Sequence, residues 1–183
     1  MRLGLVYLPS PDVSRACVAF AESLVTSVKP RMVIGPDALP HISLLHVETD
    51  NSPQAIFEEA REVLPTSCSF DILGLGLLRY DTPYMAPAAG PGTMAWLVVP
   101  CTAGLRSAER VAVSLPVLRG IPTTTGNGDD FQPHLTIAVW DGLVPPSSFA
   151  PPATLVPSRG LEGRLALGAI GPNGVYMRTL FSA

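Results

Sequence analysis

The sequence has 183 residues, of which 47% are hydrophobic and 15% are charged, and its formal net charge is −3 at pH 7. This composition can bury a core and excludes an intrinsically disordered chain. Lysine occurs once, at Lys29, and no stretch has the density of positive charge that following a long phosphate backbone requires. A small anionic substrate, or the end of a nucleic acid, suits this balance better than a duplex.

Cysteine usage and hydropathy indicate the compartment. The three cysteines, Cys17, Cys68 and Cys101, form no C-x-x-C pair, and we expect free buried thiols in a reducing compartment. The N-terminus is typical of a strand rather than a signal peptide, and no apolar run of about 18 residues predicts a membrane span. We therefore expect a cytoplasmic protein without membrane contact, and a monomer.

In chain order, the apolar runs predict strands over residues 3–8, 39–47, 70–78, 94–99 and 131–140, and a hairpin over residues 164–181. Helices are predicted from a cap at Ser10 or Asp12 to about residue 28, over 53–64, and over 102–115. Gly74 and Gly76 suggest a bend or bulge in the third strand. Because strands and helices do not alternate regularly, we expect an α+β fold, with residues 1–183 forming one domain of two lobes.

One five-residue pattern occurs twice. Residues 40–44 read Pro-His-Ile-Ser-Leu and residues 133–137 read Pro-His-Leu-Thr-Ile, about half the chain apart. Each copy places an aliphatic residue after the histidine and after the hydroxyl residue. The repetition suggests two related lobes that each contribute one strand to a shared site.

Strand geometry gives the pattern a physical meaning. Side chains alternate between the two faces of a strand, so His41 and Ser43 share a face, and His134 and Thr136 do the same. If the two strands lie side by side, two imidazoles and two hydroxyls converge on one cleft. By the same parity His46 falls on the opposite face from His41, and we exclude it from the predicted site.

These groups suit the cleavage of a phosphodiester, in which a nucleophile loses a proton and a leaving alkoxide gains one. Imidazole titrates near neutral pH and can act as base or acid, and hydroxyls can donate hydrogen bonds to non-bridging oxygens. A lone histidine on a strand is more often structural than catalytic. Two copies that use two of only three histidines are hard to ascribe to packing, because polar pairs facing a core need hydrogen-bond partners.

On the motifs at residues 41–43 and 134–136, the sequence resembles the 2H phosphoesterase superfamily, which includes 2′–5′ RNA ligase-like proteins and plant-type cyclic phosphodiesterases. The resemblance implies a bilobal fold with antiparallel sheets around a cleft, and metal-free opening of 2′,3′-cyclic phosphates or related diesters. It implies an acid–base pair of His41 and His134, phosphate contacts from Ser43 and Thr136, and no cofactor.

The substrate is expected to be small. Residues 138–140, Ala-Val-Trp, follow the second motif where many RNA ligase-like relatives have a basic residue. This departure and the acidic net charge favour a cyclic nucleotide, or an RNA terminus with a cyclic phosphate, over long RNA. Two alternatives stay open: a nucleotide-binding module without turnover, and an RNA 2′–5′ end ligase, which the scarcity of lysine weakens.

Other candidates are weaker. Aromatic residues can stack on a base at the rim of the cleft, although each is more often core or surface packing; the candidates are Tyr7, Tyr84, Phe131 and Tyr176. Trp96 lies in an apolar run and is expected in the core. No H-E-x-x-H or paired-cysteine spacing is present, so we expect no metal site.

Overall fold

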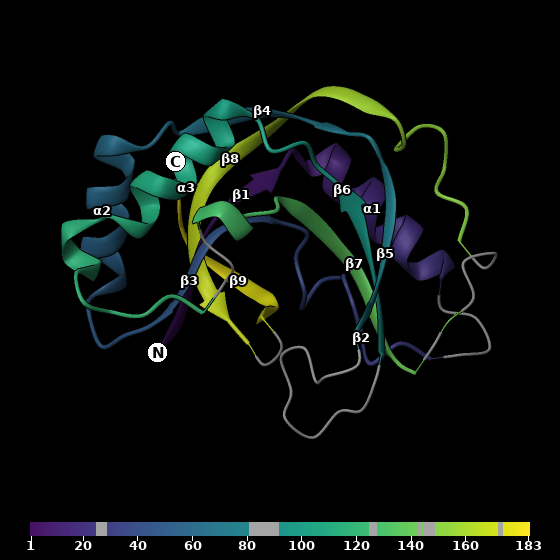
Figure 1. Cartoon of the computed structure of the whole chain (residues 1–183), viewed down its shortest axis with the longest axis horizontal. Coiled ribbons are helices and arrows are strands. Elements are labelled where there is room, and N and C mark those ends of the chain that lie inside the picture. Colours follow the sequence, from purple (N-terminus) through teal and green to yellow (C-terminus); the bar gives the residue numbers. More distant parts are fainter. Residues whose placement is uncertain (25–28, 81–91, 125–127, 143, 145–148, 172–173) are drawn as a thin grey trace.

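Two antiparallel sheets with helices against them make up the computed structural model (Figure 1), which describes residues 1–24, 29–80, 92–124, 128–142, 144, 149–171 and 174–183. The first sheet has the strand order β3-β1-β8-β4, with β9 also paired to β8. The second sheet has the order β2-β7-β6-β5. The predicted α+β fold, with two lobes of antiparallel sheet, is confirmed.

The element bounds are as follows. The first sheet contains β1 (Arg2–Pro9), β3 (Ile42–Glu48), β4 (Ser67–Ile72), β8 (Ser158–Ile170) and β9 (Tyr176–Ser182). The second contains β2 (Met32–Val33), β5 (Gly74–Tyr80), β6 (Gly92–Val98) and β7 (His134–Asp141). The helices are α1 (Pro11–Ser23), α2 (Pro53–Val63) and α3 (Ala103–Val113), with short 3-10 helices at Pro116–Leu118 and Gly128–Asp130.

The predicted strand over residues 70–78 is wrong, because the chain changes sheets within it. β4 ends at Ile72 in the first sheet, and β5 begins at Gly74 in the second. Leu73 between them is 55% exposed, and its N–H donates to the carbonyl of Val98 next to β5. The two-residue β2 was not predicted, since it is too short to show a pattern. Residues 25–28 and 172–173 of the predicted helix and hairpin lie outside the described residues.

One hydrophobic core lies between the helices and one face of both sheets. Its buried members include side chains from each helix and from strands of each sheet: Cys17, Phe20, Ile56, Phe57, Leu105, Ala108, Leu5, Ile42, Leu97 and Leu135. The opposite face of each sheet carries a smaller apolar cluster. Because this face lies outside the main core, it can carry the polar groups of the two motifs. None of the described helices is long and apolar enough to cross a membrane.

The N-termini of α2 and α3 offer a matched test of local stability. The hydroxyl of Thr102 accepts a hydrogen bond from the Leu105 N–H at 3.2 Å, whereas Ser52 makes no side-chain cap bond. Thr102→Ala should lower the free energy of unfolding by about 0.5–2 kcal/mol, because it leaves a helix N–H without its acceptor. Ser52→Ala should change the free energy of unfolding by less than about 0.5 kcal/mol, because Ser52 is exposed and its side chain caps nothing. Urea unfolding of both variants measures the difference, and equal losses would contradict it.

Candidate phosphodiester site

Each histidine strand contains one extra residue at the same place in its motif. In β3 the pairing with β1 shifts between Leu5–Leu45 and Val6–Ser43, which leaves Leu44 as the extra residue. In β7 the pairing with β6 shifts between Ala95–Ala138 and Trp96–Thr136, which leaves Ile137 as the extra residue. Both are the last residue of the five-residue pattern. The repeat in the sequence is thus a repeat of a β-bulge, which bends its strand and redirects the side chains beyond it.

The bulge in β3 corrects the expected position of His46. Because Leu44 is an extra residue, the alternation of side chains changes there, and His46 lies on the same face as Ser43. His46 Nε2 is 3.1 Å from Ser43 Oγ, and the ring centroids of His46 and His41 are 6.1 Å apart. The expectation that His46 lies on the opposite face was therefore wrong, since simple parity holds only for an unbroken strand. The bulge cannot be recognised from the residue types of the strand, so counting alternate positions could not have found it.

The two motif histidines are held in the same way. His41 Nδ1 lies 2.9 Å from the carbonyl oxygen of Leu39, and His134 Nδ1 lies 2.7 Å from that of Gln132. A carbonyl oxygen only accepts, so each Nδ1 carries the proton and donates it. In the neutral ring, Nε2 is then the nitrogen with a free lone pair. Each acceptor is the backbone carbonyl two residues before the histidine, so the local chain sets both ring orientations.

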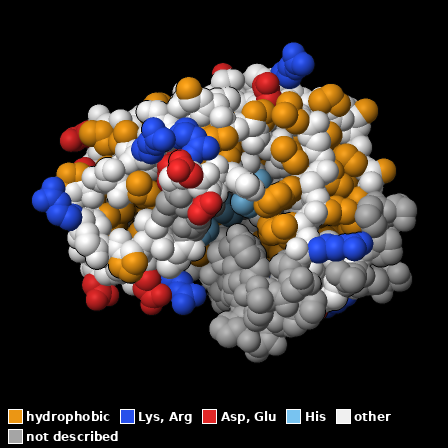
Figure 2. All heavy atoms as spheres, in the orientation of Figure 1, with side chains coloured by type: hydrophobic (Ala, Val, Ile, Leu, Met, Phe, Trp, Pro, Cys, Tyr) orange, Lys and Arg blue, Asp and Glu red, His pale blue; other side chains and the backbone are white. Residues whose placement is uncertain are grey.

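The two motifs meet although they belong to different sheets. Strand β3 contacts β7, and a charge on His134 lowers the pKa of His41. Both side chains are half-buried, whereas His46 is only 5% exposed. Figure 2 shows histidine side chains at the floor of a hollow between the two halves of the molecule, with hydrophobic side chains along one wall. This matches the predicted meeting of the two strands.

Burial lowers the pKa of all three histidines. It lowers the pKa of His41 to about 4, against the hydrogen bond to Leu39 and with a contribution from His134. It lowers the pKa of His46 to about 3, with the charges of His41 and His134 acting in the same direction. It lowers the pKa of His134 too, opposed by the hydrogen bond to Gln132. The three rings are therefore uncharged at neutral pH in the ligand-free protein.

An aromatic ring lies beside each motif histidine. The Trp96 and His134 ring centroids are 4.8 Å apart, and those of Tyr176 and His41 are 5.4 Å apart. Each aromatic ring lies over a glycine of a neighbouring strand, since a Cβ added at Gly76 would overlap the indole of Trp96. A Cβ at Gly168 would overlap the phenol of Tyr176. The apolar run around Trp96 predicted a core position, and this was wrong: Trp96 is half-buried and lies outside the main core.

The wall beside His134 is apolar. Met94 and Val139 form a small cluster on the face of the second sheet that carries Thr136 and His134, and other side chains pack against them. The partly buried members are Met32, Leu78 and Trp96. The hydroxyl of Thr136 donates to the sulfur of Met94 at 4.0 Å, which is a weak contact. This half of the site therefore offers a polar edge next to an apolar surface.

The remaining predicted aromatic residues have different positions. Tyr7 is completely buried in the main core, with its hydroxyl donating to the Pro65 carbonyl at 3.0 Å, and Phe131 is buried in the same core. The expectation that these two stack on a base is corrected, because a core position leaves no free ring face. Tyr176 is buried but contacts His41. Tyr84 lies outside the described residues.

Two of the three cysteines are unsuited to act as nucleophiles. All three are free; Cys17 is buried and Cys68 is half-buried, but Cys101 is exposed, contrary to the expectation of buried thiols. Burial raises the pKa of Cys17 and of Cys68 to about 12, so neither forms a thiolate near neutral pH.

In the part of the chain that the structure describes, no group of three or more His, Cys, Asp or Glu side chains could hold a metal ion.

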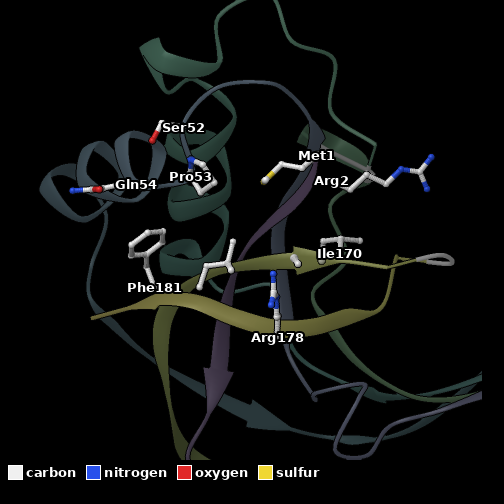
Figure 3. Close-up of a pocket in the computed structure, with 10 residues that line it drawn as sticks. Met1, Arg2, Ser52, Pro53, Gln54, Ile170, Arg178 and Phe181 are labelled. Atoms are coloured by element: carbon white, nitrogen blue, oxygen red, sulfur yellow. The ribbon is translucent and has the colours of Figure 1, made fainter.

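A separate cavity of about 540 Å³ lies near the N-terminus of α2 (Figure 3). Its lining comes from β1, α2, β8 and β9, and includes Met1, Pro53, Ile170, Arg178 and Phe181. None of the motif histidines or hydroxyl residues lines it. This cavity is thus separate from the residues of the two motifs.

The low pKa values predict how stability depends on pH. Unfolded histidine has a pKa near 6.5, so between about pH 6.5 and 4 the unfolded chain binds more protons than the folded chain. The free energy of unfolding should therefore fall as the pH falls through this window. His46→Gln should remove about 1.4 kcal/mol per pH unit from that slope. Urea unfolding at several pH values tests this, and an unchanged slope in the variant would contradict it.

The comparisons with known proteins bear on the fold. No family model and no curated protein sequence matches the chain. The crystal structure of TT0787 from Thermus thermophilus aligns with a TM-score of 0.56 and 21% identity, over 99% of this chain and 96% of that one. A crystal structure described as a phosphoesterase aligns with a TM-score of 0.50 and 12% identity, over 99% and 93% of the two chains. The chain therefore shares the fold of these two structures.

Proposed function

We propose that this protein is a 2H phosphoesterase, a metal-independent phosphodiesterase that hydrolyses a 2′,3′-cyclic phosphate or a related nucleotide diester. His41 and His134 are its acid–base pair, and Ser43 and Thr136 bind the phosphate. The observation that carries this proposal is the matched orientation of the two imidazoles. Each ring donates from Nδ1 to a backbone carbonyl two residues earlier. A packing role explains neither the identical geometry nor the two free Nε2 atoms that it leaves for a substrate.

The reaction needs two proton transfers. One histidine takes a proton from water at Nε2 while the water oxygen attacks phosphorus. The bond from phosphorus to one ribose oxygen breaks, and the other histidine, in its charged form, gives that oxygen a proton. The hydroxyls of Ser43 and Thr136 donate to the non-bridging oxygens, where negative charge concentrates. Because both rings are neutral in the free protein, the ring that serves as acid must gain its proton beside the substrate anion, which favours the charged form.

The surroundings favour a small substrate with an apolar or aromatic arm. Trp96, Leu78 and Met32 are partly exposed on the face that carries His134, and an indole can stack on a nucleobase. The net charge of −3 and the single lysine argue against a long nucleic acid. A cyclic nucleotide, or the terminal nucleotide of an RNA, fits this description. The cytoplasmic location and the monomeric state stay predictions.

The proposal predicts that each motif histidine is required for turnover. His41→Ala and His134→Ala should each lower kcat by roughly 10²–10⁴-fold, because each removes a proton-transfer group. Gln132→Ala is the matched control, because His134 uses only the backbone carbonyl of that residue. The assay is a mass-spectrometric screen of 2′,3′-cyclic mononucleotides, cyclic dinucleotides and short RNAs that end in a cyclic phosphate.

Several outcomes would contradict the proposal. Full activity in either histidine variant would exclude the acid–base pair, and loss of activity in EDTA would exclude metal independence. A cyclic nucleotide that binds in calorimetry and is recovered unchanged would instead favour a binding module. Joining of cyclic-phosphate and 5′-hydroxyl ends would favour the ligase. Circular dichroism of each variant shows whether the fold survives.

A pair of glycine variants tests the substrate arm. Gly76→Ala places a methyl group where the indole of Trp96 lies, whereas a Cβ at Gly74 meets no atom within 4 Å. Gly76→Ala should therefore displace Trp96 and raise KM for a nucleotide by at least about 5-fold, as the loss of one stacked base predicts. Gly74→Ala on the same strand should leave KM unchanged. Equal KM values for the two variants would show that Trp96 does not contact the substrate.

A further inference from the structure

The two halves of the site share one backbone plan but differ at one position. Counting five residues from each motif histidine gives His46 in the first half and Val139 in the second. Both lie two residues beyond the bulge, on the same face as the motif hydroxyl. Val139 belongs to the apolar cluster of its sheet. A polar ring is therefore present in one half where the related half has an aliphatic side chain.

The imidazole of His46 occupies a closely fitted space. Gly4 lies opposite His46 on the neighbouring strand, and a Cβ at Gly4 would lie 3.1 Å from His46 Cδ2 and 2.5 Å from Ile170 Cδ1. The ring thus lies over bare backbone, with only 5% of its surface exposed. It touches His41, with ring centroids 6.1 Å apart, and places Nε2 3.1 Å from Ser43 Oγ. This contact joins a buried polar group to the motif hydroxyl.

Among the described residues, the hydroxyl of the other half contacts a sulfur atom instead of a ring nitrogen. Thr136 Oγ1 is paired with the sulfur of Met94 at 4.0 Å, and sulfur is a weak acceptor. A hydroxyl that is held by a ring nitrogen has one orientation, whereas a hydroxyl next to a thioether can rotate. The two phosphate-binding hydroxyls are therefore unequal before any substrate binds. Ser43 is fixed and Thr136 is adaptable.

We propose that His46 is a positioning residue that donates from Nε2 to Ser43 Oγ and so directs the hydroxyl proton of Ser43 to a phosphate oxygen. This inference rests on the proposed function for its catalytic consequence, but not for the hydrogen bond itself. His46 needs to be neutral with its proton on Nε2, because a serine that donated to His46 would have no proton left for the phosphate. The burial that keeps this ring neutral is thus part of its role.

Substitutions at position 46 separate positioning from packing. His46→Gln keeps an amide N–H near the place of Nε2, whereas His46→Leu fills the space without a donor. His46→Leu should weaken the binding of inorganic phosphate and lower kcat/KM by about 5- to 10-fold, the effect of one hydrogen bond. His46→Gln should restore most of both. If the two variants lose equally while melting at the same temperature, the positioning role is overturned.

A double-mutant cycle tests whether the effect passes through Ser43. The variant with both His46→Leu and Ser43→Ala should be no worse than Ser43→Ala alone, because the group that His46 directs is already absent. His46→Leu combined with Thr136→Val should instead lower phosphate affinity by the product of the two single effects. A multiplicative loss in the Ser43 cycle would overturn the proposal. A covalent phosphoryl adduct on Ser43 in mass spectrometry would also overturn it, in favour of a nucleophilic serine.

Nitrogen NMR of the histidine rings gives a readout that needs no turnover. At pH 7 the His46 ring should be the neutral Nε2–H tautomer, and Ser43→Ala should shift its Nε2 resonance while leaving that of His134 in place. A His46 ring with its proton on Nδ1, or one that does not respond to Ser43→Ala, would overturn the hydrogen bond. If the wild type cleaves no diester, the proposed function fails, and the NMR and phosphate-binding results still decide this inference.

Discussion

The site depends on a β-bulge in each histidine strand, where the strand has one residue more than its neighbour. The strand pairing shifts by one residue at Leu44 and at Ile137, so the side chains beyond each bulge point to the opposite face from the one that simple alternation predicts. In β3 this places Ser43 and His46, three residues apart, on one face. In β7 the bulge places Val139 on the same face as Thr136. A regular strand with the same sequence would put position 46 or 139 into the core.

Burial of the three rings also makes their protonation less favourable. Desolvation favours neutral imidazole, and the proximity of the rings adds to this because a charge on one disfavours a charge on another. The carbonyls of Leu39 and Gln132 raise the pKa of His41 and of His134, against the effect of burial, because each accepts a hydrogen bond from Nδ1–H and so favours the protonated ring. The backbone thus selects the tautomer while burial selects the charge. In the proposed reaction the missing proton arrives together with an anionic phosphate, so the acid forms only where it is needed.

The sequence predicted the parts of the site that local pattern determines. The paired motifs indicated the two strands, and the structure brings these strands into contact, with His134 close enough to lower the pKa of His41. What failed depended on non-local pairing. The bulge that redirects His46 exists only relative to β1, and the change of sheet at Leu73 depends on β6, so neither is visible in the strand itself. The same holds for Tyr7, whose burial comes from strands and helices distant in sequence.

The differences between the lobes matter more for substrate orientation than the histidines do. Related by the repeated motif, His41 and His134 have the same tautomer and the same local support, so neither ring by itself tells the two ester oxygens of a diester apart. The surroundings do. Around His41 lie Tyr176 and the Ser43–His46 pair, while around His134 lie Trp96 and an apolar cluster. In the proposed enzyme, the features that distinguish the two ester oxygens are therefore these unequal surroundings and not the two imidazoles themselves.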